Sequence, residues 1–478
     1  MICISVTPSS RTLAPADLLN ASRKADMIEL CLDNFIKTPD VGDLLKLTDK
    51  PILISCRPEK DGGQFQGTEE ERLNLIRQAI VAGPEYVELD LAIADQVPRF
   101  GNTKRVISYT SLNRPLSNID EIFERCWKAK ADVVKVTWRT EDLDAAWPLL
   151  AAVSQARELP VVGQGIGPSG LTFSLLARRY GSPWIYAALE RGMEAYEGEP
   201  SVWQLQEEYG FDDIGKGTRF IGVIGLGAAE NTTVRVFNAA FQEMQKKIRC
   251  LPVIPGSLDR LKKRLGVMKI NALVVDPNWS GDLNAMCVNG GDGSRFIDLM
   301  MEGSSGWKGR TTLFDAIEAV VQEHKQDERW ASGRATTVFG TSPLALAATN
   351  WMTAHKAAVS LAAPSDNKGM SVARQAGVRH LQWAAVHASA TDIIVLAGDD
   401  IVCGTGRGEL NPSLIREHSV VIDLTQYPGE SAFAEEARAR GATYISPAAV
   451  FATQMQLQFR ALTNLELPAN AIAKGLED

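Results

Sequence analysis

Eight short β-like runs alternate with helix-like segments over the first 200 residues. The runs cover residues 2–7, 27–33, 51–57, 86–92, 105–111, 133–138, 159–165 and 184–190. Segments such as 70–83 and 119–131 lie between them with helical spacing of apolar residues. Strands joined through helices pair in parallel, because parallel neighbours need a crossover connection. Eight such units are the number that closes a barrel, so the sequence predicts a (β/α)8 barrel within residues 1–212.

Lys135 stands in the middle of the sixth run, between Val134 and Val136. Successive side chains of a strand point to opposite faces, so the valines point outward and Lys135 points into the barrel. One interpretation is a reactive amine kept in a pocket. The alternative is a structural lysine at the barrel end, paired with Glu29, Asp33 or Asp90, in an interior where carboxylates such as Glu88 balance the cations.

A second series of elements begins near Thr218 with "RFIGVIGLG" and keeps a mixed pattern to about residue 325. After a polar segment, a strand–loop–helix pattern and four further strand-like runs follow. This rhythm is typical of a doubly wound dinucleotide fold. We therefore expect an α/β chain with three parts: the barrel, a substrate-type domain of residues 218–325 completed by the helical tail 446–475, and a Rossmann-like domain of residues 333–445.

Composition excludes several classes of function. The net charge is −8 and no lysine or arginine block is present, which argues against nucleic-acid binding. No run of about 18 apolar residues offers a membrane span. The seven cysteines include no CxxC pair and the start lacks a signal-peptide pattern, so we expect reduced thiols in a cytoplasmic protein. The first histidine is residue 324, so acid–base chemistry in the first half needs other side chains.

The stretches "MIELCLD", "ISCRPEKDGG" and "ADVVKV" resemble strands of type I 3-dehydroquinate dehydratase. The resemblance implies that Lys135 forms a Schiff base with a ketone, and that Glu29 and Arg57 contact the substrate. Burial in the barrel is expected to lower the pKa of Lys135 and leave more neutral amine for attack.

Several positions depart from that family's pattern, and the first is Cys31, which stands where an arginine is usual. Thr110 stands where the family has its acid–base histidine, Ser174 replaces an arginine, and Glu199 replaces a substrate-contacting glutamine. A threonine hydroxyl cannot hold a proton at neutral pH, and acid–base help is worth roughly 10²–10⁴-fold in rate. Fewer cations and an added anion weaken the binding of an anionic substrate.

Residues 218–470 resemble shikimate dehydrogenase, also with departures. Asn231 and Thr233 stand where two serines bind the substrate carboxylate, and Gln454 matches the family's substrate glutamine. Trp279 and Leu313, however, replace the lysine and aspartate that handle the proton.

Gly340, in "FGTSPLA", matches the glycine turn that binds the cofactor, and NADP is implied by this resemblance alone. Side chains at Thr341 and Ser342, and the ring of Pro343, crowd the approach of a pyrophosphate. The alternative for Gly340 is a tight strand–helix turn with no nucleotide.

The resemblance thus implies a fused dehydratase–dehydrogenase homologue of the shikimate pathway that takes a small anionic carbocyclic substrate. We expect the lyase half to be weak or redirected to another carbonyl compound, and the dehydrogenase half to be inactive. The alternative is a non-catalytic protein that binds a metabolite or a protein partner. The sequence leaves a homodimer open.

Overall fold

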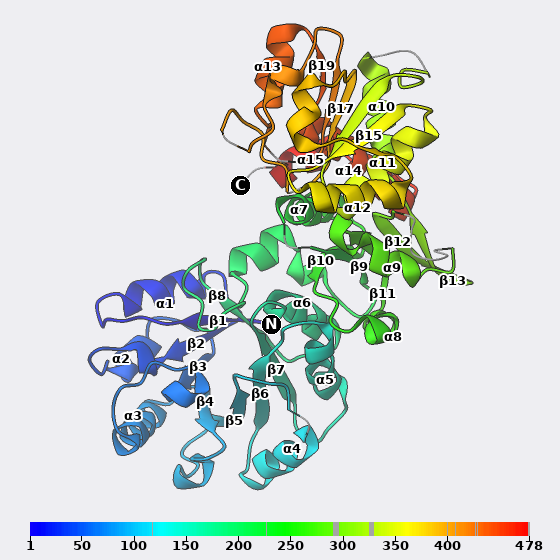
Figure 1. The fold of residues 1–478 in the computed structure, drawn as a ribbon. Helices are drawn as coiled ribbons and strands as arrows, with labels where there is room; N and C mark the ends of the chain where they lie inside the picture. The colour runs from blue at the N-terminus through cyan, green and yellow to red at the C-terminus, as the bar shows by residue number, and fades with distance from the viewer. Residues whose placement is uncertain are drawn as a thin grey trace. The chain divides into compact units, whose positions relative to one another are not determined.

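The computed structural model describes residues 1–116, 118–225, 227–289, 296–324, 329–398, 400–406, 408–425, 427 and 429–476. The chain folds into two compact units. The first contains Met1–Phe220 and Phe241–Ile270, and the second contains Ile221–Ala240 and Asn271–Asp478. Figure 1 shows the strands and helices of both. Within the described residues, none of the helices combines the length and the apolar character that a membrane crossing requires.

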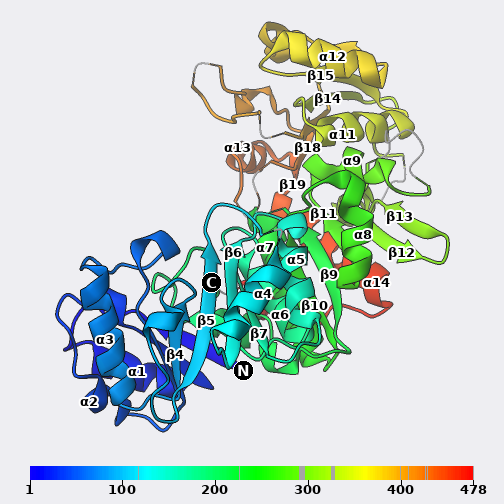
Figure 2. The same ribbon diagram turned by 90° about the horizontal axis from the view of Figure 1, so that it is seen from below.

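Eight parallel strands form the centre of the first unit. They are β1 (Ile2–Val6), β2 (Met27–Cys31), β3 (Ile52–Ser55), β4 (Tyr86–Asp90), β5 (Lys104–Ser111), β6 (Val133–Arg139), β7 (Val161–Ile166) and β8 (Ile185–Ala188). Their hydrogen-bonded order is β7-β6-β5-β4-β3-β2-β1-β8, and Figure 2 shows β5 and β6 side by side. β7 and β8 approach each other at the two ends of this order, which curls the sheet into a near-barrel.

Helices lie outside the strands of the first unit (Figure 1). They are α1 (Ala14–Ser22), α2 (Val41–Leu45), α3 (Glu69–Val81), α4 (Ile119–Lys128), α5 (Leu143–Ser154) and α6 (Gly170–Arg179). The expectation of one helix between every pair of strands is wrong at one place, because β4 and β5 are joined by a single 3-10 turn, Ala94–Gln96. In the same unit, α8 (Leu258–Met268) packs on α5 and ties to it through an Arg264–Asp144 ion pair of 2.6 Å.

A five-stranded sheet follows in the chain. Its order is β10 (Ile248–Val253), β9 (Arg219–Ile224), β11 (Ile270–Val275), β12 (Leu299–Gly303) and β13 (Gly306–Arg310). β12 runs antiparallel to both β11 and β13. The helices of this part are α7 (Ala228–Glu243), α9 (Ser280–Ala285) and α10 (Leu313–His324).

The last sheet has six parallel strands. They are β14 (Ala335–Phe339), β15 (Ala358–Ala362), β16 (Arg379–His380), β17 (Ile393–Leu396), β18 (Val420–Asp423) and β19 (Thr443–Ile445), with α11 (Pro343–Ala354), α12 (Asp366–Ala376) and α13 (Phe433–Arg440) between them. The order β16-β15-β14-β17-β18-β19 is the 3-2-1-4-5-6 order of dinucleotide-binding folds.

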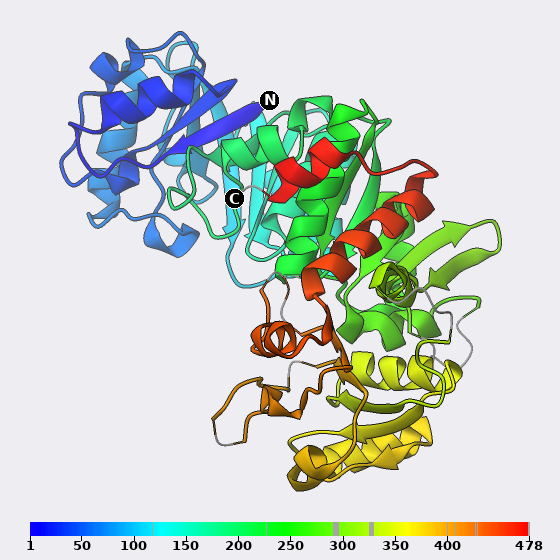
Figure 3. The ribbon, with the colours of Figure 1, turned by 90° about the horizontal axis from the view of Figure 1, so that it is seen from above.

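The chain ends in two helices, α14 (Pro447–Thr463) and α15 (Ala469–Leu476). α14 packs on α10 and, in Figure 3, lies along α7, where the rings of Phe459 and Phe237 meet at 5.3 Å. The predicted fold class, α/β with an N-terminal (β/α)8-type barrel followed by further α/β sheets of which the last is Rossmann-like, is confirmed.

Candidate functional site

The interior of the barrel is built in layers. The lower layer is an apolar cluster made of Cys3, Met27, Leu53, Val106, Val133, Val162, Trp184 and Tyr186, with Tyr86 packed against it. In a strand, the side chain two residues after a given residue lies on the same face, so the next layer is formed by the residues two positions after those of the lower layer. Those positions are polar and buried on seven of the eight strands: Ser5, Glu29, Ser55, Glu88, Ser108, Lys135 and Gln164. We call these seven residues the polar ring.

Lys135 belongs to the polar ring and is 0% exposed. Its Nζ atom lies 2.8 Å from Oε2 of Glu88 and 4.3 Å from the centre of the Tyr186 ring. Burial by itself would lower the pKa of Lys135, but Glu88, followed by Tyr186 and Glu29, outweighs it and raises that pKa well above its ordinary value. The expectation that this amine has a lowered pKa is therefore wrong. Its carboxylate partner is Glu88. Asp90, one of the partners that the sequence suggested, pairs with Arg72 instead.

Glu29 and Arg57 meet in the same interior. Nη1 of Arg57 lies 3.5 Å from Oε1 of Glu29, and its Nη2 donates to the Cys31 sulfur at 3.2 Å. Burial would raise the pKa of Glu29, but Arg57 and Lys135 outweigh it and hold that pKa below its ordinary value. The structure thus brings together Lys135, Glu29 and Arg57, the three residues that the sequence selects from the barrel.

Arg57 retains hydrogen-bonding capacity. Its guanidinium stacks on the Tyr196 ring at 4.7 Å, yet its Nε and Nη1 atoms have no hydrogen-bond partner within the described residues. A buried donor without an acceptor costs free energy, so an oxygen of a ligand that accepts from these atoms would bind favourably here. A cavity of about 10 Å³, room for about one water, lies here between Arg57, Glu88 and Thr110.

Glu199 is a further buried carboxyl group beside the polar ring. It comes from the loop after β8 and lies 3.1 Å from the Ser5 hydroxyl, while the Ala195 N–H donates to its other oxygen at 2.7 Å. Burial raises the pKa of Glu199 to about 7, against the hydrogen bonds and Arg57. The sequence pointed to Glu199 only as a substituted position. No local sequence pattern predicts its contact with Ser5, because the two residues are 194 positions apart.

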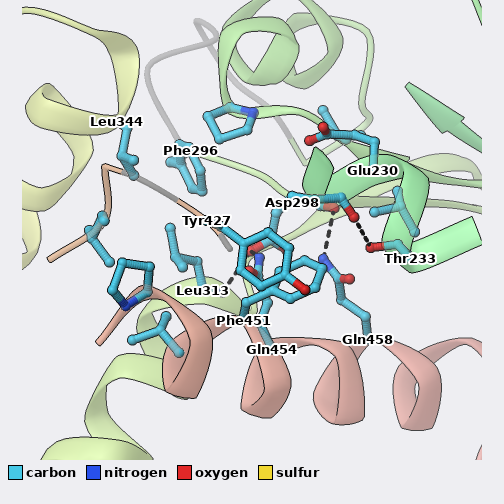
Figure 4. Close-up of a pocket in the computed structure, with 17 residues that line it drawn as sticks. Glu230, Thr233, Phe296, Asp298, Leu313, Leu344, Tyr427, Phe451, Gln454 and Gln458 are labelled. Carbon is cyan, nitrogen blue, oxygen red and sulfur yellow. Dashed lines mark hydrogen bonds between the residues drawn. The ribbon is translucent and has the colours of Figure 1, made fainter. Parts of the chain in front are cut away.

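The second unit contains a larger cavity of about 150 Å³ around Asp298 (Figure 4). Asp298 accepts hydrogen bonds from the Thr312 and Leu313 backbone N–H groups, the Thr312 hydroxyl and the Gln454 amide. Burial raises the pKa of Asp298 to about 6, while these hydrogen bonds oppose the rise. The sequence reasoning missed Asp298, which directly precedes β12.

Of the three substrate-binding residues predicted for the second half, two line this cavity and the third does not. Thr233 and Gln454 both line the cavity around Asp298. The Thr233 hydroxyl donates to the Ala229 carbonyl at 2.9 Å, which leaves its lone pairs for a ligand. Asn231 is exposed and is not part of the cavity lining. Leu313, in place of an aspartate, contributes an apolar wall.

Gly340 directly follows β14 and has a φ of 130°, and a Cβ atom there would lie 2.5 Å from the Ala397 carbonyl oxygen. The close approach of the two strands therefore requires glycine at this position whether or not a nucleotide binds.

The loop after Gly340 does not fit a pyrophosphate. The Thr341 N–H and hydroxyl donate to the Asp400 carboxylate at 3.2 and 2.8 Å, and Ser342 caps α11 through the Ala345 N–H. Pro343 supplies no N–H. The Asp400 carboxylate thus occupies the donors that a phosphate would need, and its negative charge repels a phosphate. The residues present do not fit NADP.

No group of three or more histidine, cysteine, aspartate or glutamate side chains within the described ranges is arranged to hold a metal ion.

Comparisons with known proteins agree with the barrel geometry. Residues 2–216 match the model of the family described as type I 3-dehydroquinase. The chain is 27% identical over 231 residues to the chloroplastic bifunctional 3-dehydroquinate dehydratase/shikimate dehydrogenase of Arabidopsis thaliana, a match that covers 46% of this chain and 38% of that protein. It is 24% identical over 214 residues to the 3-dehydroquinate dehydratase of Dehalococcoides mccartyi, covering 44% of this chain and 94% of that enzyme.

Among solved structures, the dehydroquinate dehydratase and shikimate dehydrogenase from S. pombe aligns with 100% of this chain and 98% of its own, with a TM-score of 0.43 and 14% identity. The similarity to dehydratases lies in the barrel part of the chain, which carries the buried Lys135 on its sixth strand. The barrel part of the chain, residues 2–216, is thus similar to the type I 3-dehydroquinase family.

Proposed function

We propose that the barrel unit is a slow Schiff-base lyase of the type I dehydroquinase kind, in which Lys135 forms an imine with a small ketone and water is then eliminated. The observation that carries the proposal is the position of Lys135: its Nζ atom is fully enclosed in the polar ring, beside Glu88 and within the electrostatic reach of Glu29 and Arg57. An ammonium group is seldom buried in this way unless a partner or a chemical role retains it.

The chemistry follows from the residues present. The carbonyl oxygen leaves as water when the lysine nitrogen takes its place on the carbon, which gives a protonated imine. That imine withdraws electrons and acidifies the neighbouring carbon. Loss of a proton there gives an enamine, whose electron pair then expels a hydroxyl from the next carbon as a second water. Glu88 accepts the proton that Lys135 must release before its nitrogen can attack.

The charges around the site indicate the substrate. Lys135 and Arg57 are opposed by Glu88 and Glu29, so no positive charge is left over for a carboxylate. The Nε and Nη1 atoms of Arg57 make no hydrogen bond within the described part of the chain, although Nη1 faces Glu29 at 3.5 Å, and their N–H groups suit a hydroxyl or carbonyl oxygen. We therefore infer a small carbocyclic hydroxyketone, with weak binding of the anionic 3-dehydroquinate for which the relatives are named.

Borohydride reduction tests this proposal. The protein is incubated with 3-dehydroquinate or with uncharged cyclic ketones, reduced and weighed by mass spectrometry. We expect one adduct per chain, lost in Lys135→Met and retained in Lys128→Met, which changes an exposed lysine of α4. A protein that gives no adduct with any ketone is not an imine-forming lyase.

A non-catalytic role is the second candidate, and the size of the barrel cavity favours it. About 10 Å³ holds no ketone unless the loops above the strands move, and the two ion pairs fill the interior as a structural core would. In that case the cavity of about 150 Å³ around Asp298 is the binding site, and it takes a small metabolite without hydride transfer, because apolar residues replace the proton-handling pair.

A further inference from the structure

One hydroxyl group stands between two buried carboxyl groups in the barrel. The Ser5 Oγ atom lies 2.8 Å from Oε2 of Glu29 and 3.1 Å from Oε1 of Glu199. A serine hydroxyl carries a single hydrogen, and an ionised carboxylate only accepts hydrogen bonds. Both contacts are hydrogen bonds only if one of the two carboxyl groups carries a proton and donates it to Ser5.

The surroundings decide which group carries it. Glu29 faces the guanidinium of Arg57 at 3.5 Å and is under the influence of Lys135, and both cations favour its ionised form. Glu199 has no ion-pair partner among the described residues, and its second oxygen is occupied by the Ala195 N–H. The proton therefore lies on Oε1 of Glu199 and points to Ser5, whose own hydrogen points to Glu29.

The titratable and charged groups around Glu199 come from several elements. They are Glu29 on β2, Arg57 after β3, Cys3 on β1 and Tyr196 on its own loop. Burial is the largest influence and raises the pKa of Glu199, Glu29 adds to the rise, and Arg57 opposes it. The balance leaves a pKa of about 7, the range in which a carboxyl group both takes and gives a proton at neutral pH.

We propose that Glu199 is the proton carrier of the barrel site, in the role that Thr110 cannot fill, and that it exchanges its proton through the Ser5 hydroxyl. This inference rests on the proposed lyase function. In its ionised form Glu199 takes the proton from the carbon next to the imine by way of Ser5: the hydroxyl accepts that proton and passes its own hydrogen to the carboxylate. The electron pair of the broken C–H bond enters the enamine. The protonated carboxyl group then gives that proton to the departing hydroxyl, which leaves as water with the C–O electron pair. One proton is taken and one is returned, so no co-reactant is needed.

The test measures exchange of the carbon-bound hydrogen. The imine is formed in D₂O with a ketone that gives a trapped adduct, and deuterium incorporated per trapped adduct is read by mass spectrometry. We expect incorporation per adduct to fall about 10²-fold in Glu199→Gln, which keeps the shape and can still donate to Ser5. In the wild-type protein incorporation rises with pH through about 7, and this inflection is absent in the variant. Ser5→Ala reduces incorporation in the same direction.

Wild-type incorporation rates in Glu199→Gln, or the same inflection in both proteins, overturn the inference. A separate measurement keeps it distinct from the lyase proposal. Infrared difference spectra of wild type against Glu199→Gln are expected to contain the carbonyl band of a protonated carboxyl group below pH 7 that fades above it. If the wild type traps no ketone, imine chemistry fails, and the band still decides whether Glu199 holds the proton. The absence of the band overturns the inference on its own.

Discussion

The Nζ atom of Lys135 lies 2.8 Å from Oε2 of Glu88, and the two side chains are 0% and 4% exposed. Removing two charges from water is expensive, and their attraction offsets that cost only when the pair stays together. The lysine is consequently held as an ammonium ion, with a pKa well above its ordinary value. We infer that this pairing stabilises the barrel interior and, in the proposed lyase, sets the pH at which the amine reacts.

The Glu88→Gln variant is predicted to form the imine at lower pH than the wild type. Neutral amine is required for attack, and in the wild type it becomes populated only as the pH approaches the raised pKa of Lys135. Without the Glu88 carboxylate, the strongest interaction that raises the pKa of Lys135 is gone, so burial brings that pKa below its value in the wild type. Borohydride trapping across a pH series should give a profile displaced toward acid. An unchanged profile would mean that Glu88 does not control the amine.

Lys135→Met is predicted to destabilise the protein by about 3–5 kcal/mol, because it leaves the Glu88 carboxylate buried without a cation. The double variant Lys135→Met/Glu88→Gln removes the stranded charge and should recover much of the loss. Urea unfolding of the three proteins measures this. Equal stability of the single and double variants would show that the two charges are not coupled.

Thr110→His is predicted to raise the elimination rate by roughly 10²–10⁴-fold. Thr110 lines the small cavity with Arg57 and Glu88, and Glu88 is the partner of Lys135, so an imidazole at position 110 would lie beside that pair. The gain should disappear when Lys135→Met is added. Turnover of 3-dehydroquinate, followed by the absorbance of its unsaturated product, gives the rate. A histidine without effect would indicate that the geometry around the lysine is no longer that of a lyase.

NADPH is predicted not to bind saturably to the wild-type protein, because Asp400 holds the Thr341 N–H and hydroxyl. In Asp400→Ala those donors are free and the repulsion of phosphate is gone, so some binding should return. Titration followed by NADPH fluorescence distinguishes the two proteins. Saturable binding by the wild type would contradict the account of this loop.

The alternation of strands and helices was enough to predict the barrel and the Rossmann-like sheet, since each connection limits how its strands pair. Strand alternation was also enough to predict that Lys135 faces inward. The partner of Lys135 was not predictable, because Glu88 lies on β4, two strands away, and only the stagger of the barrel brings them together. The same partner makes the pKa of Lys135 shift upward, whereas burial alone predicted a downward shift.

Side chains from loops were predicted least well. Glu199 and Asp400 belong to segments without a repeating pattern, and each acts through a contact with a distant residue, Ser5 or Thr341. Asn231 was selected by similarity of motif, yet it is exposed and does not line the cavity, whereas Asp298, which does, was not predicted. Periodicity locates the faces of strands and helices, but the ends of loops depend on tertiary packing.

Peptide mapping of the reduced adduct tests the central claim most directly. The protein is treated with a cyclic ketone and borohydride, digested, and the modified lysine is identified by fragmentation. The account predicts a single modified site at Lys135, on the peptide that contains β6, and no modification there in Lys135→Met. Label spread over exposed lysines, or none at Lys135 at any pH, would contradict it.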